Sequence, residues 1–481
     1  MGCVRTRTEA GLLAALFLAA PAAAQEAPWK AALDRHMAAL EAEGDLHPAC
    51  LVRTLEGKIL YAWRPGEPRV LASNLKLLTT AAVLWQLPPD WRWTTRVWLE
   101  GDRLWIAGDG DPSLRRLPDH DAAGAFLDAL AAALREAGCD RVGGIVLDDR
   151  AFGREFRPPA WPPEQWDRDY CAPVAALSVE ANSLLVRMER GGAWSAFPAW
   201  HPPLRARVRD TGGGRPVAIR WEEPDAVLAF TGDPGRGGSV RLAVRDPLAA
   251  YGRWLRAGLR ERGIAAGAAR PVRPEEERGP SAREILAWPS HWRLAEAVVV
   301  ANKDSENFTA EVLLRTLALG AGRPGTREEG LRRELEILEE QGLDPAAWAP
   351  ADGSGMGRKA DGSLNRASPQ AVCDLLEAAA RSPFARLYFD SLPAAGVAGQ
   401  GRLEDRFQDP VFQPARVRAK TGFITGASSL SGYALAPDDT ILVFSTVINY
   451  RRDGTPRTNN RRFRDLQEEV LRRILQDWTR P

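Results

Sequence analysis

The sequence predicts a mixed α/β domain that is split by a mainly β inserted region. The chain has 481 residues, too many for one ordinary hydrophobic core, so two or three domains are expected. Helical and strand patterns mix near both ends, in residues 25–92 and 264–481. Residues 93–263 instead show short alternating runs separated by turns rich in Gly, Pro and Asp. We assign the two ends to one domain and the middle to one or two mainly β domains, with two subdomains favoured.

The composition is typical of a soluble globular protein and excludes some functions. Hydrophobic residues make up 45% of the chain and charged residues 26%. The 64 basic and 63 acidic residues leave a net charge of +1, which argues against nucleic-acid binding by bulk charge. The sequence has no Cys-x-x-Cys, and its five histidines are scattered, so no metal site is expected.

The N-terminus reads as an export signal. Basic residues precede a short apolar core, Gly11–Ala20, and Ala22–Ala24 fits a signal-peptidase site. We therefore expect a signal peptide over residues 1–24, a cut before Gln25 and a periplasmic protein without a transmembrane anchor. An uncleaved anchor is the alternative, although the apolar core is short for a membrane span.

Export would permit disulfide bonds in the mature chain. Four cysteines remain after cleavage, which allows three complete pairings, and the sequence does not choose among them. All four could equally be buried thiols. They are Cys50, Cys139, Cys171 and Cys373.

The first candidate motif is a Ser-x-x-Lys at the start of an apolar helical run. A helix over residues 29–43 and a hairpin of residues 49–55 and 58–64 precede it. Ser73 and Lys76 would lie one turn apart on one helix face, so the amine could take the hydroxyl proton. This requires a lysine pKa lowered by burial or by a neighbouring cation. Alone, the motif also fits a capping serine beside a surface lysine.

Patterns assign the remaining elements. Strands are expected at residues 95–99, 104–107, 144–147, 183–188, 217–221, 226–231, 239–244, 417–422, 428–435 and 440–448, and helices at 122–137, 248–262, 292–301, 307–319, 328–341, 369–380 and 462–477. Residues 264–290 are rich in Arg, Glu and Pro and are expected to form a connection. The apolar stripe of the last helix favours core packing over membrane binding.

Two further motifs could complete a site with Ser73 and Lys76. Ser305 and Asn307 stand at a helix start, where they could relay a proton and grip a substrate carbonyl, or simply cap the helix. Lys420 lies on a strand, where it could attract a carboxylate and lower the lysine pKa, or protect an edge strand. Gly422 would let an extended peptide lie against that strand.

The ordered set Ser-x-x-Lys, Ser-x-Asn and Lys-Thr-Gly resembles the serine penicillin-recognising enzymes. The 232 residues from Ser73 to Ser305, which contain the insertion, are similar to the class C low-molecular-mass penicillin-binding proteins. These are D-Ala-D-Ala carboxypeptidases and endopeptidases. Flanking segments agree with that group over the whole mature chain: residues 72–77, 108–112, 178–182, 351–356 and 428–433.

The resemblance implies a fold, a reaction and its residues. The split domain would have the β-lactamase/transpeptidase fold, an antiparallel sheet flanked by helices. The catalytic residues would be Ser73, Lys76, Ser305, Asn307 and Lys420, with Thr421, Gly422 and Phe423 binding substrate. Ser73 would form an acyl-enzyme with peptidoglycan stem peptides or β-lactam antibiotics, without a cofactor. A homodimer is compatible with the resemblance.

Two departures from the family pattern affect substrate contacts, and two alternatives stay open. Gly357 replaces a serine, and extra residues precede Asn365 in a loop expected to rim the cleft. Phe423 replaces a threonine, so a hydroxyl contact to the terminal carboxylate is lost or moved to Thr421 or Thr425. The alternatives are a β-lactamase or esterase on the same scaffold, and a non-catalytic peptidoglycan-binding scaffold.

Overall fold

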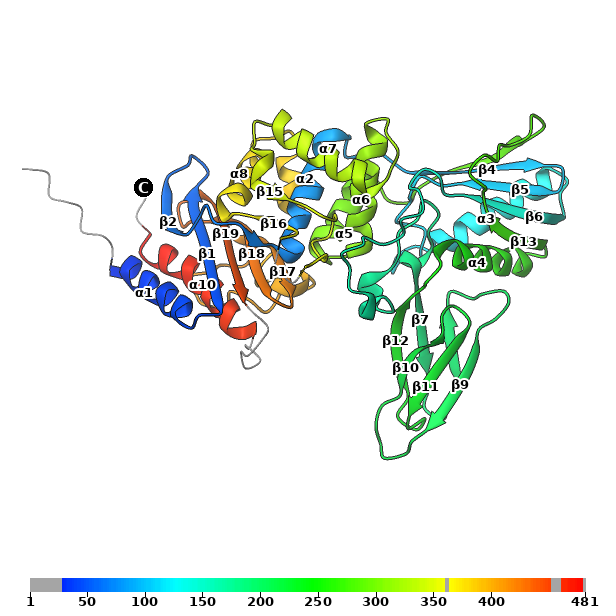
Figure 1. Ribbon diagram of the computed structural model, residues 1–481, viewed down its shortest axis with the longest axis horizontal. Coiled ribbons are helices and arrows are strands. Elements are labelled where there is room, and N and C mark those ends of the chain that lie inside the picture. Colours follow the sequence, from blue (N-terminus) through cyan, green and yellow to red (C-terminus); the bar gives the residue numbers. More distant parts are fainter. Residues whose placement is uncertain (1–27, 360–362, 451–459, 479–481) are drawn as a thin grey trace, which may run out of the picture.

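A computed structural model describes residues 28–359, 363–450 and 460–478, so the expected signal peptide and its cut before Gln25 lie outside the described residues. Both ends of the chain build one lobe, and the middle of the chain builds a second lobe beside it (Figure 1). No helix in the described part of the chain is long and apolar enough to cross a membrane.

The first lobe contains an antiparallel sheet that joins the two chain ends. In order across the sheet, its strands are β17 (Val417–Ile424), β18 (Ala427–Leu435), β19 (Ile441–Tyr450), β1 (Leu46–Thr54) and β2 (Ile59–Trp63). The N-terminal hairpin therefore pairs directly with the last strand, with Cys50 opposite Thr446. On one face, α1 (Pro28–Ala42) and α10 (Asn460–Gln476) share a hydrophobic core with the sheet.

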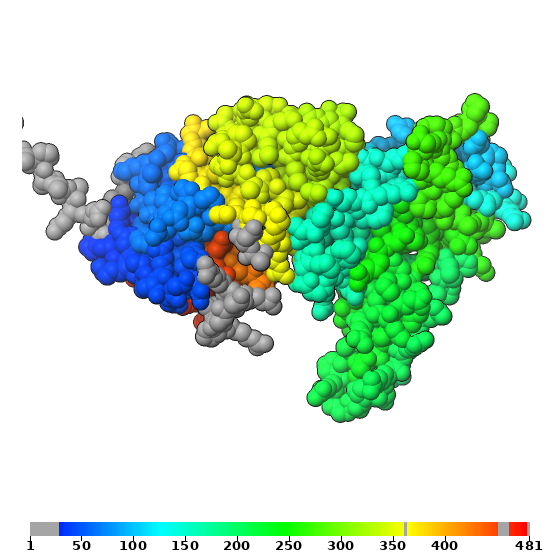
Figure 2. Space-filling model, in the orientation of Figure 1, coloured from blue at the N-terminus to red at the C-terminus, as the bar shows by residue number. Residues whose placement is uncertain are grey.

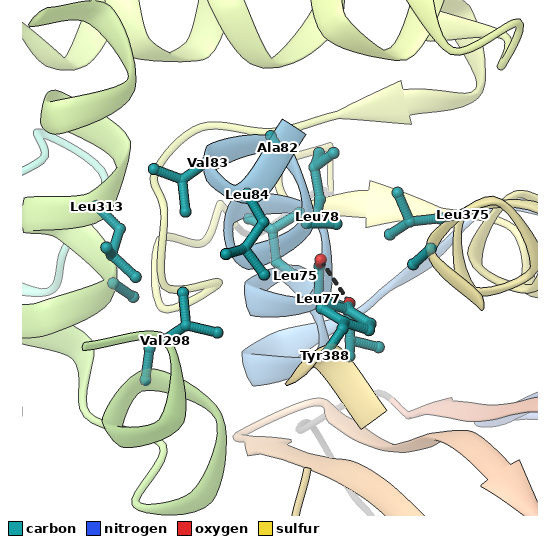
Figure 3. Packing of buried hydrophobic residues seen from close by; sticks show 14 of the residues in the cluster. Leu75, Leu77, Leu78, Ala82, Val83, Leu84, Val298, Leu313, Leu375 and Tyr388 are labelled. Atoms are coloured by element: carbon teal, nitrogen blue, oxygen red, sulfur yellow. Dashed lines mark hydrogen bonds between the residues drawn. The ribbon is translucent and has the colours of Figure 1, made fainter. Parts of the chain in front are cut away.

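Helices cover the other face of this sheet, and α2 (Lys76–Gln86) lies at their centre. The others are α5 (Leu294–Lys303), α6 (Asn307–Gly320), α7 (Arg327–Glu340), α8 (Pro369–Ala380) and α9 (Ala385–Ser391). The first nine residues of α2 are all buried. Figure 3 shows its leucines packed against Val298, Leu313 and Leu375, and the Tyr388 hydroxyl donates a 2.8 Å hydrogen bond to the Leu77 carbonyl. Close packing on every side holds the start of α2 in one position.

Three short strands lie close to the start of α2. β3 (Arg69–Val70), β16 (Arg366–Ala367) and β15 (Trp348–Ala349) form a small antiparallel sheet. The Leu71 amide also donates to the Asn365 carbonyl at 2.9 Å. Asn365 is thereby held close to Ser73.

The second lobe has two parts, and only one of them is mainly β. A five-stranded mixed sheet packs with α3 (Ala122–Glu136) and α4 (Pro247–Glu261); its strands, in order, are β13 (Ala265–Pro271), β6 (Arg141–Asp148), β5 (Arg103–Ala107), β4 (Thr94–Glu100) and β14 (Arg283–Pro289). The projecting part in Figure 1 holds two three-stranded sheets: β12 (Gly238–Ala243), β7 (Ser183–Met188) and β8 (Trp194–Phe197), and β10 (Ala218–Glu223), β11 (Val227–Gly232) and β9 (Arg205–Asp210).

The expected boundary after residue 263 is wrong, because β13 and β14 complete the five-stranded sheet. Residues 264–290 are thus part of the inserted lobe and are no mere connection. Strand β13 is rich in small residues and therefore lacks the apolar pattern of a strand. The small residues are needed because β13 and β6 lie very close together: a Cβ on Gly267 would lie 1.9 Å from the Gly143 carbonyl oxygen. The lobe ends where it began, since the Ser290 amide donates to the Trp93 carbonyl at 2.8 Å.

The described cysteines form no disulfide bond. Cys50, Cys171 and Cys373 are buried thiols, and Cys139 is partly exposed. Cys50 Sγ lies 3.2 Å from the Thr446 hydroxyl. Of the two readings left open by the sequence, the structure has the unpaired thiols.

Candidate active site

Ser73 lies on a short 3₁₀ turn, η1 (Ala72–Leu75), that leads directly into α2. Ala72 has a φ of 50°, in the left-handed region that non-glycine residues rarely adopt. The next turn brings Lys76 Nζ to 3.1 Å from Ser73 Oγ. The two residues therefore lie within reach of each other, as their spacing predicts.

The Lys76 amine is enclosed by oxygen atoms. Besides Ser73 Oγ, Asn307 Oδ1 lies 2.7 Å and the Ser354 carbonyl oxygen 2.8 Å from Nζ. The side chain is 0% exposed. Burial lowers its pKa to about 7, against the opposing charges of nearby carboxylates, Asp352 first. The expected lowering is present, but its cause is burial rather than a neighbouring cation.

Ser305 and Lys420 form the second hydroxyl–amine pair. Ser305 sits between α5 and α6 with a φ of 58°, and Lys420 Nζ on β17 donates to its Oγ at 2.8 Å and to the Thr421 carbonyl at 3.0 Å. Lys420 is 1% exposed. Burial, and then the like charges of Lys76 and Arg402, hold the pKa of Lys420 well below its usual range.

Asn307 connects the first lobe to the inserted lobe. Its Oδ1 accepts from Lys76, while its Nδ2 donates to the Tyr170 carbonyl at 2.9 Å and approaches Met356 Sδ at 3.3 Å. The amide is thus occupied by the protein, whereas the sequence led us to expect it to grip substrate. It can still meet a substrate if one of these contacts gives way.

A second contact between the lobes lies next to Asn307. The Arg115 guanidinium donates to both Glu306 carboxylate oxygens, at 2.8 and 3.1 Å, and lies over the Trp292 ring. This ion pair lowers the pKa of Glu306 although burial opposes it. Two adjacent residues at the start of α6 are therefore held by the insertion. In Figure 2 the two lobes lie against each other without an open gap on the face shown.

Gly422 and Gly355 let backbone segments converge on Ser73. A Cβ on Gly422 would lie 2.6 Å from the Leu71 carbonyl oxygen and 2.2 Å from Ser429 Oγ. A Cβ on Gly355 would lie 1.9 Å from the Ala72 carbonyl oxygen. The close approach at Gly422 is therefore to the protein's own turn, and the expected contact of this strand with a substrate peptide stays a prediction.

Asp352 organises the loop in which the family pattern is altered. Its carboxylate accepts from the Gly355 and Gly357 amides, both at 2.6 Å, and from Asn365 Nδ2 at 3.1 Å. A Cβ on Gly357 would lie 2.4 Å from Asp352 Oδ2, so the serine usual in the family does not fit this conformation. Asn365 keeps its place beside Asp352 despite the extra residues, of which 360–362 lie outside the described part.

A cleft of about 890 Å³ opens over these groups. Ser73, Ser305 and Asn307 line it, as do Thr421 and Phe423. The buried amines of Lys76 and Lys420 lie behind the two serines. The Phe423 side chain is 51% exposed. The described residues include no group of three or more His, Cys, Asp or Glu side chains placed to hold a metal ion.

The sequence profile of the D-Ala-D-Ala carboxypeptidase 3 (S13) family matches residues 29–469. The chain belongs to this family. The predicted resemblance to the class C penicillin-binding proteins is therefore confirmed, and with it a serine-type carboxypeptidase, a hydrolase.

Similar proteins agree with this assignment. The D-alanyl-D-alanine carboxypeptidase of Actinomadura sp. (strain R39) is 29% identical over 443 residues, which are 86% of this chain and 79% of that protein. The crystal structure of penicillin binding protein 4 (dacB) from Haemophilus influenzae has a TM-score of 0.75 at 20% identity, covering 92% and 99% of the two chains. The same protein complexed with a β-lactam has a TM-score of 0.69 at 19% identity, covering 89% and 96%. The predicted β-lactamase/transpeptidase-like fold with inserted domains is confirmed.

Several groups at the site were not singled out from the sequence. Backbone carbonyls of Ser354 and Tyr170 have no side-chain signature, although Ser354 lies in a segment that matched the family. Arg115 follows the matched segment 108–112, which was the one available signal for it. Asp352 lies in the same matched segment, 351–356, although nothing in the sequence marked it as the centre of its loop.

Proposed function

We propose that Ser73 is the nucleophile of a D-Ala-D-Ala carboxypeptidase or D,D-endopeptidase acting on peptidoglycan stem peptides, with Lys76 as its general base. This proposal rests on the hydrogen-bond partners of the Lys76 amine. A neutral amine has two hydrogens and one lone pair. Asn307 Oδ1 and the Ser354 carbonyl oxygen can only accept hydrogen bonds. They accept the two amine hydrogens, at 2.7 and 2.8 Å from Nζ. The lone pair is left facing the Ser73 hydroxyl, 3.1 Å away.

The pKa of this amine suits a general base near neutral pH. With a pKa of about 7, Lys76 is neutral in a large fraction of molecules near neutral pH and can hold the proton it receives. Burial is the main cause of this lowered pKa. A lysine with its ordinary pKa would be neutral in fewer than about one molecule in a thousand at pH 7.

The reaction then has two halves. Ser73 Oγ attacks the carbonyl of the penultimate D-Ala while its proton passes to Lys76, and the backbone amides of Ser73 and Phe423 donate to the oxyanion. The C–N bond breaks as Ser305, beside Lys420, delivers a proton to the departing amine, and the proton held by Lys76 then returns to Ser305, which restores the base. Water then attacks the acyl-enzyme while Lys76 takes its proton; the ester bond to Ser73 breaks, the proton returns from Lys76 to Ser73 Oγ, and the shortened peptide leaves.

β-lactams would acylate the same serine. The Haemophilus relative has been crystallised with a β-lactam, and the strained amide of a penicillin offers Ser73 the same kind of carbonyl. The amine released from a penicillin remains tethered to the acyl group, so it stays in the cleft and hinders water. A long-lived adduct is expected, whereas a β-lactamase would release hydrolysed penicillin steadily.

Labelling with a fluorescent penicillin tests the nucleophile. The wild-type protein and a Ser382→Ala control, which changes a serine whose hydroxyl bonds to the Ala379 carbonyl, should label equally. Ser73→Ala should not label while keeping the wild-type melting temperature. Strong covalent labelling of Ser73→Ala would refute the assignment.

Digestion of purified cell-wall sacculi separates the two peptidase activities. Release of free D-Ala identifies a carboxypeptidase, and conversion of cross-linked dimers to monomers identifies an endopeptidase. Binding of muropeptides without any product would instead support a non-catalytic scaffold.

We also propose that the protein is exported to the periplasm by its N-terminal segment. The basic residues, the apolar core Gly11–Ala20 and the small residues before Gln25 support this. N-terminal sequencing of protein purified from cells should begin at Gln25. A chain that begins at Met1 and remains with the membrane would point to an uncleaved anchor.

A further inference from the structure

The cleft lacks one group that its family usually supplies, a hydroxyl directly after Lys-Thr-Gly. Phe423 holds that position and presents an aromatic ring, half of it exposed, to the cleft. An aromatic ring neither donates to nor accepts from a carboxylate as a hydroxyl does. A peptide that ends in D-Ala, and equally a penicillin, nevertheless carries a carboxylate next to the bond that is cut.

Lys420 is a poor substitute for the missing group. Its amine is fully buried and already donates to Ser305 Oγ and the Thr421 carbonyl. The same burial disfavours its charged form, so the positive charge that a carboxylate would need is weakened there. Another cation has to face the anion from the open side of the cleft.

Arg402 is placed for this. It lies in a short turn, η6 (Gly401–Leu403), that packs against the end of α5: a Cβ on Gly401 would lie 3.0 Å from the Lys303 carbonyl oxygen. Its side chain lines the same cleft as Ser305, Thr421 and Phe423. Its positive charge also helps to lower the pKa of Lys420.

Arg402 also has a guanidinium free to bind. Among the described residues, none forms a hydrogen bond or an ion pair with it. Its neighbour Arg406 lines the cleft as well, but donates to Glu468 at 2.7 Å and to the Arg464 carbonyl at 3.2 Å. Arg406 therefore fixes α10 to this wall, whereas Arg402 has no anionic partner within the described part of the chain.

Two other cleft arginines lack a side-chain partner among residues 28–359, 363–450 and 460–478, and each is less well placed. Arg241 belongs to β12 in the inserted lobe, where its charge acts on Glu180 and Glu306. Arg464 extends from α10, and its charge acts on Arg406. Of these three arginines, Arg402 is the one whose charge acts on Lys420.

We propose that Arg402, together with the Thr421 hydroxyl, binds the carboxylate adjacent to the scissile bond in place of the hydroxyl that Phe423 lacks. This inference rests on the proposed function of the cleft. A guanidinium can grip a carboxylate through two parallel N–H···O bonds, so one arginine compensates for a lost hydroxyl contact. The substrate class is thereby narrowed to peptides and β-lactams with a free carboxylate at this point.

The test compares the second-order rate constants for acylation by benzylpenicillin and by its methyl ester, which has no charge at this carboxyl. Wild type should prefer the acid by about ten- to hundredfold, the usual worth of a hydrogen bond to a charged group. In Arg402→Gln this preference should fall towards one, with the ester rate unchanged. Adding Phe423→Thr to Arg402→Gln should restore part of the preference for the acid.

Controls keep the outcomes distinct. Arg386→Gln removes the same charge from an exposed site on α9 and should behave as wild type. Unchanged acid preference in Arg402→Gln, or its loss in Arg464→Gln instead, overturns the assignment of Arg402 while the proposed nucleophile stands. Absence of acylation in the wild type would overturn the proposed function itself. Equal melting temperatures of the variants exclude a folding defect as the cause of a lost preference.

Discussion

Replacing Gly422 by alanine should damage catalysis through a single methyl group. Gly422 has an ordinary φ, so alanine suits its backbone, and only the space around the new Cβ decides the result. That carbon would lie 2.6 Å from the Leu71 carbonyl oxygen, 3.1 Å from the Asn74 amide nitrogen and 2.2 Å from Ser429 Oγ. Leu71 and Asn74 lie on either side of Ser73, so the clash falls on the turn that carries Ser73.

The size of the effect follows from these distances. Rotating Ser429 relieves one clash but breaks its 2.6 Å hydrogen bond to the Leu71 carbonyl. The backbone clash then requires β17 and η1 to separate by roughly 0.5–1 Å, since ordinary carbon–oxygen contacts are about 3.4 Å or longer. Overpacking of this kind costs about 1–3 kcal/mol in the free energy of unfolding. A shift of about 1 Å between reacting groups can lower the rate by about a hundredfold.

The assay measures fluorescent-penicillin acylation and thermal unfolding of the same preparations. Gly66→Ala is the matched control, because Gly66 lies in a turn with nothing within 4 Å of a Cβ. It should change neither quantity. Gly422→Ala should acylate tens of times more slowly and unfold at a lower temperature. Acylation within twofold of wild type would refute the claim that Gly422 sets the distance between β17 and Ser73.

Three further predictions test the site. The acylation rate should rise about tenfold from pH 6 to pH 8, because the pKa of Lys76 is about 7 and only the neutral amine accepts a proton. Stopped-flow labelling measures this rate. The Lys76→Arg variant should be slower than wild type at every pH, by about 10²–10⁴-fold. Arg115→Met should lower the free energy of unfolding in urea by about 1–3 kcal/mol, because Glu306 loses its ion pair, and adding Glu306→Gln should recover part of the loss. Gly357→Ser should lower the melting temperature, since its Cβ would clash with Asp352; an unchanged temperature would show that the loop can adapt.

Strongly periodic elements could be predicted from the sequence almost to the residue. The helix expected over residues 307–319 is α6 (Asn307–Gly320), and the three C-terminal strands match β17, β18 and β19 within two residues at each end. Strand β9 escaped detection because arginines alternate along it and nearly all of its residues are exposed, which leaves no apolar period. Strand β13 escaped because close pairing with β6 favours alanine and glycine.

The candidate site likewise has features that could be predicted from the sequence and features that could not. Ser73 and Lys76 are one helical turn apart, so the proximity of the amine to the hydroxyl could be predicted from their spacing alone. The grouping of Ser305 with Lys420 depends on the fold and was expected only through the family resemblance. Backbone contacts, such as the Tyr170 carbonyl on Asn307, depend on where two lobes meet and leave no trace in the order of side chains. The cause of the lowered lysine pKa likewise needed the burial of Lys76 to be known.

Because the two ends of the inserted lobe are adjacent, the lobe could be removed while the first lobe stays connected. Trp93 and Ser290 are hydrogen-bonded neighbours, so a short linker could bridge them and the first lobe would keep its sheet and helices. Such a minimal enzyme would nevertheless lose the tether on Asn307 and the arginine on Glu306. The first lobe could keep its topology without the insertion, but the insertion holds the beginning of α6 beside Lys76.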